Sequence, residues 1–533
     1  MPDGRRSGWT DAYSVAGGRD PWPIVGIISI ATFMEVLDVS IVNVALNHIA
    51  GSLSASYEQA TWVLTSYLVS NAVIIPMSGW LSETIGRKRY YMLSVALFTL
   101  ASLACGMSTS LPMLIAARVA QGIGGGGLAP VEQSMLADTF PPEKRGGAFA
   151  AYGVVVIVGP ILGPTLGGWI TEHLSWHWVF LINAPVGLVS LVLVWMFVDE
   201  SKAVRRRRRE RLSRGLRIDF IGFALIALFL GCLEVTLDQG ELKNWFESPM
   251  ITGFAVISGI AFLALIPWEL VHQHPVVNLK LYANRNFAIS SLLMLVTGAV
   301  VFGSTQFIPQ LLQNVMGYTA ELAGMALTMG GLVAFVVMPL AGILTNRFDA
   351  RYLVGAGLLI QAFALWHMTT LNAQISFWDA AWVRLYQAVG LPLLFIPITN
   401  SAYVGLRPED SDQASGLLNV ARNLGGTIGI STVQTMLARS EQFHLDRLVE
   451  YLNPLDSNYR IMLDRLTQEL ASRGMSQVEA GRTAVAMLYQ QTQTQAQMLS
   501  FLDIFNVFTI LVLLAFPLVF LMRKPQGGAP AAA

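Results

Sequence analysis

The 533-residue chain has few charged residues and almost no cysteine. Asp, Glu, Lys and Arg make up 13% of it, which is about half the share in ordinary soluble domains. The 34 basic and 34 acidic residues cancel, so no global field attracts nucleic acid and we expect no nucleic-acid partner. The two cysteines, Cys105 and Cys232, lie in separate apolar runs, and we expect buried thiols rather than a disulfide.

Apolar residues, by contrast, are abundant. Hydrophobic residues make up 54% of the chain, there are 47 glycines, and the mean hydropathy is +0.54. This composition excludes a soluble globular enzyme, a disordered chain and a secreted disulfide scaffold, because only lipid can solvate so much apolar surface. The first 20 residues are polar and contain no signal-peptide core, so we expect the first apolar segment to stay in the membrane.

Apolar runs of membrane-spanning length, about 20 residues each, recur along the whole chain. We predict fourteen transmembrane helices, at residues 23–48, 60–82, 89–108, 111–137, 148–172, 177–198, 217–237, 250–270, 287–313, 322–345, 352–371, 380–404, 413–437 and 500–522. The even number places both termini on one side of the membrane.

The distribution of lysine and arginine predicts which side that is. With the N-terminus inside, 24 basic residues fall in inside segments, whereas the short outside loops hold only Lys243. The positive-inside rule therefore predicts cytoplasmic N- and C-termini. The run Arg205–Arg209 invites a lipid-binding or nucleic-acid-binding interpretation, but we favour a topology signal on a cytoplasmic linker.

The two ends of the chain resemble each other. Arg118 begins an Arg-x-x-Gln-x-x-Gly pattern, and Arg384 begins the same pattern 266 positions later. Such a repeat predicts a transporter built by duplication, with two six-helix halves. We expect an N-terminal half at 1–200, a basic linker with two inserted helices at 201–280, and a C-terminal half at 281–533.

Four stretches carry a family resemblance. Residues 79–89 read GWLSETIGRKR, 37–46 read LDVSIVNVAL, 118–127 read RVAQGIGGGG and 159–168 read GPILGPTLGG. Together they resemble the major facilitator superfamily, specifically its fourteen-span drug–proton antiporter branch, and most closely the EmrB-type multidrug efflux pumps of Gram-negative bacteria. The sequence departs from the pattern in two places, since Glu83 stands where Asp is usual and Asn47 where Pro is expected.

The resemblance implies a major facilitator fold with fourteen transmembrane helices and a proton-coupled antiporter. It would export hydrophobic drugs or toxic compounds across the bacterial inner membrane by alternating access. The proton gradient is then the energy source, and no cofactor is needed. The implied partners are small hydrophobic drugs, protons, an EmrA-like periplasmic adaptor and a TolC-like outer-membrane channel. One alternative is a proton-coupled exporter of a native solute such as a fatty acid, siderophore or sugar. Another is a channel or sensor.

Other chemistry finds no support in the sequence. No G-x-x-x-x-G-K-[ST] loop is present, so we do not expect ATP to supply the energy. No His/Cys cluster has metal-binding spacing, and no nucleophile–base arrangement stands out. We therefore expect neither a metal site nor an enzyme.

A charge inside a predicted span costs about 2.5–3.5 kcal/mol or more and needs a partner. Four such residues matter most: Glu35, Asp38, Arg118 and Glu132. Glu35 and Asp38 share one face of the first span. Asp38 lies roughly 15 Å, and Arg118 roughly 10 Å, from the outer ends of their helices. Since the family fold makes these helices neighbours, we predict an Asp38–Arg118 pair that protonation releases. The alternative is a static salt bridge.

Glu132 lies fourteen residues after Arg118 on the same helix face, about 21 Å nearer the cytoplasm. Burial favours the neutral form of a carboxyl group, so Glu132 is a candidate proton or cation site. The alternative is a neutral side chain hydrogen-bonded to a neighbouring helix.

The motif residues carry expected conformational roles. In 79–89, the acid and the basic cluster can form a charge latch at the cytoplasmic face; an ordinary positive-inside loop is the alternative. In 159–168, glycines every fourth residue make a flat packing face, and the prolines favour a bend. The resemblance implies a seal between the halves there, and a merely structural contact is the alternative. The motif residues concerned are Gly79, Glu83, Gly86, Arg87, Lys88, Gln121, Gly159, Pro160, Gly163 and Gly167.

The second half differs from the first in its charges. Arg384 mirrors Arg118 by repeat position, yet span 9 has no acid matching Asp38, and residues 304–306 are Ser, Thr and Gln. We therefore expect proton coupling mainly in the first half. Five aromatic or polar residues are candidate substrate contacts, with simple packing as the alternative: Trp62, Tyr67, Asn71, Tyr386 and Asn400.

Segment 438–499 is a long connection before the last span. It carries six basic and seven acidic residues, with apolar residues at helical spacing. We expect periplasmic helical hairpin material that docks an adaptor, or alternatively a cap that packs on itself.

Overall fold

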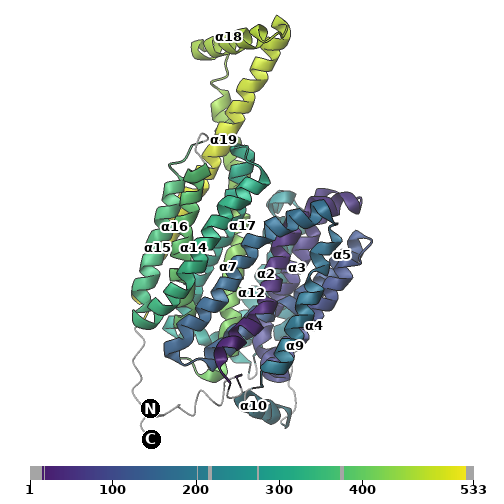
Figure 1. The fold of residues 1–533 in the computed structure, drawn as a ribbon, viewed down its shortest axis with the longest axis vertical. Coiled ribbons are helices and arrows are strands. Elements are labelled where there is room, and N and C mark those ends of the chain that lie inside the picture. Colours follow the sequence, from purple (N-terminus) through teal and green to yellow (C-terminus); the bar gives the residue numbers. More distant parts are fainter. Residues whose placement is uncertain are drawn as a thin grey trace.

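The computed structural model describes residues 15–16, 19–200, 202–213, 219–272, 275–372 and 377–523, and within these segments it contains helices and no strand. Residues 1–14, most of the predicted N-terminal segment, lie outside the described residues, as do 214–218 of the predicted basic linker. Figure 1 shows two groups of long helices side by side, with α10 at one end and α18 projecting from the other. We refer to these as the α10 end and the α18 end.

The first helical group follows the first six predicted spans. It consists of α2 (Pro21–Ser52), α3 (Tyr57–Ile85), α4 (Arg87–Gly106), α5 (Leu111–Gly125), α6 (Leu128–Thr139), α7 (Pro142–His173), α8 (His177–Leu181) and α9 (Asn183–Phe197). Polar caps begin several of these helices; Ser56, for example, forms a capping box with Gln59 at the start of α3. The fourth predicted span is divided into α5 and α6 within a run of four glycines.

The second group repeats the first after an insertion. The insertion consists of α10 (Lys202–Ser213), α11 (Phe220–Gln239), the short η1 (Glu241–Lys243) and η2 (Trp245–Glu247), and α12 (Pro249–Val271). The second group consists of η3 (Leu279–Ala283), α13 (Arg285–Gln310), η4 (Leu311–Val315), α14 (Ala320–Arg347), α15 (Ala350–Met368), α16 (Phe377–Ala402), η5 (Pro408–Asp410), α17 (Ser411–Val449), α18 (Ser457–Ser472), α19 (Gln477–Ala515) and α20 (Leu518–Leu521).

The pairing of helices repeats between the groups. In the first group α2 packs on α7, α3 on α5, and α4 on α5 and α9. In the second group α13 packs on α17, α14 on α16, and α15 on α16 and α19. Because the same partners recur in the same chain order, the sequence repeat corresponds to a repeated six-helix arrangement.

Ten helices of the described chain are long and apolar enough to cross a membrane, or eleven if the bent pair Glu143–Pro160 and Thr165–His173 is one span. The predicted spans 111–137, 352–371 and 413–437 are helical but fall short of that standard. The first is divided into two short helices, α15 carries Arg351, Gln361 and His367 in 19 residues, and α17 is rich in polar residues. The chain is a multi-pass membrane protein, and the count of fourteen stays a prediction.

The two groups meet along two seams. At the first seam α3 packs on α17, and a Cβ at Gly79 would lie 3.0 Å from Gln413 Cα. At the second seam α7 packs on α14, and a Cβ at Gly146 would lie 2.7 Å from the Gly342 carbonyl oxygen. All four of these residues lie toward the α10 end of their helices, so bare glycines bring the two groups together there.

The predicted connection 438–499 is helical. The last part of α17 and the first part of α19 extend beyond the bundle, and α18 lies across their tip (Figure 1). Helix α18 packs on α19, yet none of its residues is buried. Its apolar residues, including Ile461 at 62% exposed, are available for further contacts.

Close packing of α13 on α17 allows a stability prediction. A Cβ at Gly425 would lie 2.0 Å from the Leu295 carbonyl oxygen, so Gly425→Ala forces the helices apart. We expect it to lower the free energy of unfolding by about 1–3 kcal/mol, measured as a lower Tm in detergent. Gly168→Ala is the control, because a Cβ there meets nothing within 4 Å. Equal Tm values for the two variants would contradict the packing argument.

Candidate functional site

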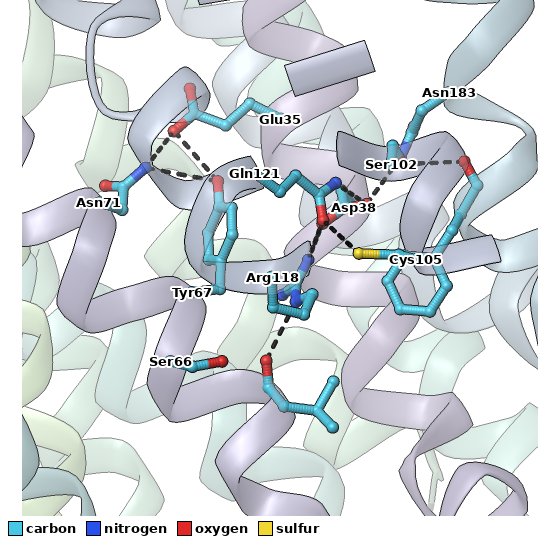
Figure 2. Close-up of polar contacts among 12 residues, drawn as sticks. Glu35, Asp38, Ser66, Tyr67, Asn71, Ser102, Cys105, Arg118, Gln121 and Asn183 are labelled. Carbon is cyan, nitrogen blue, oxygen red and sulfur yellow. Dashed lines mark hydrogen bonds and ion pairs between the residues drawn. The ribbon is translucent and has the colours of Figure 1, made fainter. Parts of the chain in front are cut away.

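A buried ion pair joins two helices of the first group. Arg118 Nη1 on α5 lies 2.6 Å from Asp38 Oδ2 on α2, and both side chains are 0% exposed. Gln121 Nε2 donates to Asp38 Oδ1 over 2.9 Å, and Asn183 Nδ2 on α9 donates to the same oxygen over 2.6 Å. Figure 2 shows these donors converging on the Asp38 carboxylate. The structure thus brings the predicted pair together; its role in proton coupling stays a prediction.

Arg118 is held from several directions. Its Nε donates to the Val63 carbonyl oxygen over 3.0 Å, and its Nη1 also donates to Gln121 Oε1 over 2.8 Å. The guanidinium lies 4.2 Å from the centroid of the Tyr67 ring, a cation–π distance. Its Nη2 is buried and has no hydrogen-bond partner. The guanidinium is therefore fixed in place, with one donor unused.

The glycine run after Arg118 lets α5 approach its neighbours. A Cβ at Gly122 would lie 2.0 Å from Ser70 Oγ on α3, and a Cβ at Gly124 would lie 2.5 Å from Phe98 N on α4. Side chains at these positions would push α5 away from α3 and α4. The local sequence therefore sets how deeply Arg118 enters the bundle.

Glu35 lies one turn before Asp38 on α2. Its Oε1 accepts a hydrogen bond from Asn71 Nδ2 over 3.0 Å and a longer one from the Tyr67 hydroxyl over 3.5 Å (Figure 2). Its Oε2 is buried without a partner. Tyr67 and Asn71 were predicted as substrate contacts; here both are buried, 1% and 6% exposed, and bind this carboxyl.

Glu132 on α6 is 0% exposed and faces α2, where its two carboxyl oxygens accept hydrogen bonds from the Ser29 and Thr32 hydroxyls. This geometry corresponds to the alternative in which Glu132 is hydrogen-bonded to a neighbouring helix. Ser29, Thr32, Glu35 and Asp38 follow one another at steps of three residues on α2. We call this row of polar residues the α2 ridge.

A second buried ion-pair cluster lies at the α10 end. Arg87 Nη1 lies 2.8 Å from Asp138 Oδ2, and Arg87 Nε lies 2.9 Å from Asp412 Oδ2. Ser411 Oγ donates to the other Asp138 oxygen over 2.7 Å. Because Asp138 belongs to the first group and Asp412 to the second, Arg87 joins the two groups. Arg87 of the predicted motif thus forms ion pairs with two aspartates, one from each group; a latch role for this motif stays a prediction.

The loop around Arg87 is shaped by Gly86, which has φ +102° and ends α3. A Cβ there would also lie 2.7 Å from Glu200 Oε2. Burial raises the pKa of the Glu200 carboxyl, opposed by its hydrogen bonds to the Lys88 and Arg87 backbone. The Lys88 ammonium donates to the Trp195 carbonyl oxygen over 2.9 Å. This motif thus packs against the end of α9 as well as carrying the latch.

The glycines of the 159–168 motif face α2. Cβ atoms at Gly159, Gly163 and Gly167 would meet Val36, Ser40 and Ile41, respectively. These contacts lie within the first group, which fits the merely structural alternative. Pro160 follows directly at the bend between the two segments of α7. A seal between the halves by this motif stays a prediction.

The remaining predicted substrate contacts are Trp62, Tyr386 and Asn400. Tyr386 packs its ring against Phe363, His367 and Trp382 on α15 and α16. Trp62 and Asn400 are half-buried. Their role as substrate contacts stays a prediction.

Arg384 occupies the position equivalent to Arg118. Its Nη1 donates to Gln387 Oε1 over 2.8 Å, as Arg118 does to Gln121, and its Nη2 donates to Thr305 Oγ1 over 3.0 Å. Within the described part of the chain no acid forms an ion pair with it. The charge asymmetry predicted between the halves is present.

Comparison with known proteins identifies the family. A model described as Major Facilitator Superfamily matches residues 28–430. The chain belongs to the major facilitator superfamily. The human organic anion transporter MFSD10 (TETRAN) has the same fold, with a TM-score of 0.58 at 14% identity over 93% of this chain and 98% of that one. The predicted all-helical major facilitator fold is confirmed.

Two curated members of the superfamily are more similar in sequence. "Multidrug export protein EmrB" of Escherichia coli (strain K12) is 38% identical over 94% of this chain and 95% of its own. "Fatty acid resistance protein FarB" of Neisseria gonorrhoeae is 33% identical over 94% of this chain and 96% of its own. The predicted resemblance to EmrB-type proteins is confirmed.

Sequence reasoning missed several residues of these networks. Asn183, Asp138 and Asp412 were not among the candidate residues. Asp412 is the second residue of α17 and stands close to Glu409 and Asp410, so by sequence it resembles a solvated residue near a loop, although it is 3% exposed. No local signal in the sequence singles it out.

The Arg87 latch predicts a change in accessibility. Asp412→Asn removes the charge that the second group offers to Arg87, so the groups should separate more often at the α10 end. Ser415→Cys supplies a reporter, since Ser415 is buried and donates to the Pro130 carbonyl oxygen. We expect thiol labelling of this cysteine to become about 5- to 150-fold faster, the span of typical coupling free energies.

The matched control is Asp410→Asn, because Asp410 pairs only with the exposed Arg407. Native Cys105 and Cys232 are buried and should label slowly. Labelling that is equally slow in the Asp412 and Asp410 variants would show that Arg87 does not hold the groups together.

Proposed function

We propose that this chain is a proton-coupled antiporter that exports hydrophobic drugs or toxic compounds across a bacterial inner membrane by alternating access. The buried Asp38–Arg118 network carries the proposal, because a buried ion pair inside this fold, in a chain similar to a multidrug export protein, supports a carboxyl that exchanges a proton. Residues 1–200 and 281–533 act as the two halves, with 201–280 inserted between them. Both termini lie in the cytoplasm, so the α10 end is the cytoplasmic one.

Proton coupling at Asp38 follows from its partners. The carboxylate is neutralised by Arg118 and receives amide donors from Gln121 and Asn183. A proton on Asp38 removes the Coulombic attraction and one acceptor, and leaves a buried guanidinium without its counter-charge. Arg118 must then find another acceptor, which changes the contact between α2 and α5. This link turns proton uptake into helix movement.

The α2 ridge offers a route between proton sites. Glu35 lies on the same helix as Asp38, toward the α10 end, and Glu132 on α6 is bound to Ser29 and Thr32 of that helix. Hydroxyl and carboxyl groups at steps of three residues can pass a proton with short side-chain movements. Glu35 and Glu132 are therefore proposed as relay groups between Asp38 and the cytoplasm.

The Arg87 latch and the motif glycines govern the conformational step. Contacts among Arg87, Asp138 and Asp412 hold the halves together at the cytoplasmic end. Alternating access requires those contacts to break when the protein opens inward. Gly79, Gly86 and Lys88 shape the loop that carries the latch.

A second candidate is export of a native anionic solute such as a fatty acid. Arg384 favours it, since the described residues give this guanidinium only neutral partners. The similarity to a fatty acid resistance protein agrees with this alternative. Trp62, Tyr386 and Asn400 remain proposed substrate contacts in either case.

An EmrA-like periplasmic adaptor and a TolC-like outer-membrane channel are the proposed partners. The projection of α17, α18 and α19 carries exposed apolar residues at the end opposite α10 (Figure 1). A surface of this kind suits a helical partner. The proton gradient supplies the energy, and no cofactor or catalytic activity is proposed.

The proposal predicts the effect of Asp38→Asn. This variant cannot carry the coupling proton, so uphill drug efflux should be abolished while some drug binding remains. The measurement is collapse of a pH gradient in reconstituted vesicles after adding ethidium, a lipophilic cation, and then an anionic drug. Asp446→Asn, an exposed acid on the extension of α17, is the control and should behave as wild type. Unchanged efflux by Asp38→Asn would rule out the coupling role.

The partner proposal predicts the effect of deleting residues 445–495. Transport by purified protein in vesicles should persist, whereas resistance of whole cells that depends on an adaptor should be lost. Vesicle transport and cell resistance are measured side by side. Loss of folding would instead favour a cap that packs on the rest of the protein.

A further inference from the structure

The inserted segment crosses the α3–α17 seam near the α18 end. From α11, Asp238 accepts a hydrogen bond from the Thr65 hydroxyl on α3, and Gln239 Nε2 donates to Thr65 Oγ1 over 2.8 Å. On the other side, Glu234 Oε1 accepts from the Thr427 hydroxyl on α17 over 3.0 Å. One helix outside both repeats is therefore bonded to both of them.

The two acids lie one turn apart on α11. Glu234 is 5% exposed, and within the described chain its side chain forms one hydrogen bond and no ion pair. Asp238 likewise has only the Thr65 and Gln239 side chains as partners. Two carboxylates so placed, without a cation, are costly inside a membrane.

A third observation shows that this cluster lacks a donor. Gln239 is 0% exposed, and its Oε1 has no hydrogen-bond partner among the described residues, while its Nε2 is shared among Asp238, Thr65 and Thr61. A buried acceptor without a donor is unfavourable. A single added proton both supplies a donor and removes one negative charge.

The other charged groups around α11 are engaged elsewhere or distant. Glu58 on α3 pairs with Lys243, and Glu241 accepts from the Trp245 indole. Glu269 on α12 lies at the opposite end of the helix pair and accepts from the Val277 amide. On α17, Arg422 lies five residues before Thr427 and has no hydrogen bond or ion pair with either α11 acid.

We propose that Glu234 and Asp238 form a second proton-exchanging pair of the transport cycle, whose protonation releases the inserted helix from one side of the α3–α17 seam. The inference rests on the proposed antiport function. A proton from water adds to a carboxylate oxygen, forming an O–H bond and removing one negative charge. The acid can then donate, so Thr427 or Thr65 changes from donor to acceptor. Loss of the proton to water reverses the step.

Release of α11 has a consequence for transport, because α3 and α17 must move relative to each other during alternating access. The halves already meet at the α10 end through Arg87 and Asp412. When that end opens, α3 and α17 must move relative to each other at the α18 end, while α11 is tied to both. A neutral hydrogen bond is about half as strong as one to a carboxylate. Protonation therefore weakens the tie when the helices need to move.

The first experiment measures distance rather than transport. Spin labels are placed at Leu242, next to α11, and at Arg439 on α17, both exposed, after replacement of Cys105 and Cys232. We expect the wild-type distance distribution to differ between low and high pH. The double variant Glu234→Gln with Asp238→Asn should give the low-pH distribution at every pH. A wild-type pH response in this variant would overturn the proposal.

The second experiment measures ethidium-driven proton flux in vesicles. The double variant should lose about 5- to 150-fold in uphill flux while retaining ethidium binding. Glu247→Gln, an exposed acid on η2, is the control and should match wild type. Glu234→Asp keeps a titratable acid at this position, so, unlike the double variant, it should keep the pH dependence of the spin-label distance. Wild-type flux in the double variant would contradict the inference.

Failure of the proposed antiport function and misfolding of the double variant can each be distinguished from failure of this inference. If wild type shows no drug-driven proton flux, the proposed function fails, while the distance measurement still decides whether α11 responds to protons. If the double variant does not fold, Thr427→Val replaces it, since this change removes the bond to Glu234 and keeps both acids. That variant should show the released distance even at high pH. A wild-type distance at every pH would refute the proposed tie.

Discussion

The cost of a charge in lipid is the constraint on which the rest of this structure depends. Asp38 and Arg118 are both fully buried inside the first helical group. The cost of burying this ion pair is offset by its other contacts. Gln121 and Asn183 donate hydrogen bonds to the Asp38 carboxylate, and the Val63 carbonyl and the Tyr67 ring hold the Arg118 guanidinium. Four helices must therefore keep fixed positions around one carboxylate. A change in the protonation of Asp38 would therefore alter contacts of all four helices.

The same constraint explains why the two halves differ although they arose as a repeat. Arg384 keeps the contact to Gln387 that Arg118 makes to Gln121, but hydroxyl groups replace the acid. The second group therefore retains the positive charge and loses the site that neutralises it. A buried ion pair in the first half and, among the described residues, a cation with only neutral partners in the second half suit a transporter whose halves have different roles.

Contacts between the halves depend on where backbones can approach. Glycines at both seams let helices touch near the α10 end, and Arg87 adds a charged contact at that position. Near the α18 end the α3–α17 seam is crossed instead by side chains of the inserted helix α11. The inserted helix α11 is thus more than a spacer between the two repeats, because it is hydrogen-bonded to α3 of the first group and to α17 of the second.

The sequence by itself determined the membrane class, the helical fold, the duplication and the family, since each depends on apolar length, spacing or motif order along the chain. It also indicated the Asp38–Arg118 pair, because intramembrane charges are few and must be matched. Only the tertiary structure decided the partners. Asn183, Asp138 and Asp412 lie between 51 and 325 positions from the charges they contact, and nothing local distinguishes the buried Asp412 from its partly exposed neighbours Glu409 and Asp410. The seam positions likewise depend on how whole helices pack, so the glycines of 159–168 could be recognised from the sequence while the helix they face could not.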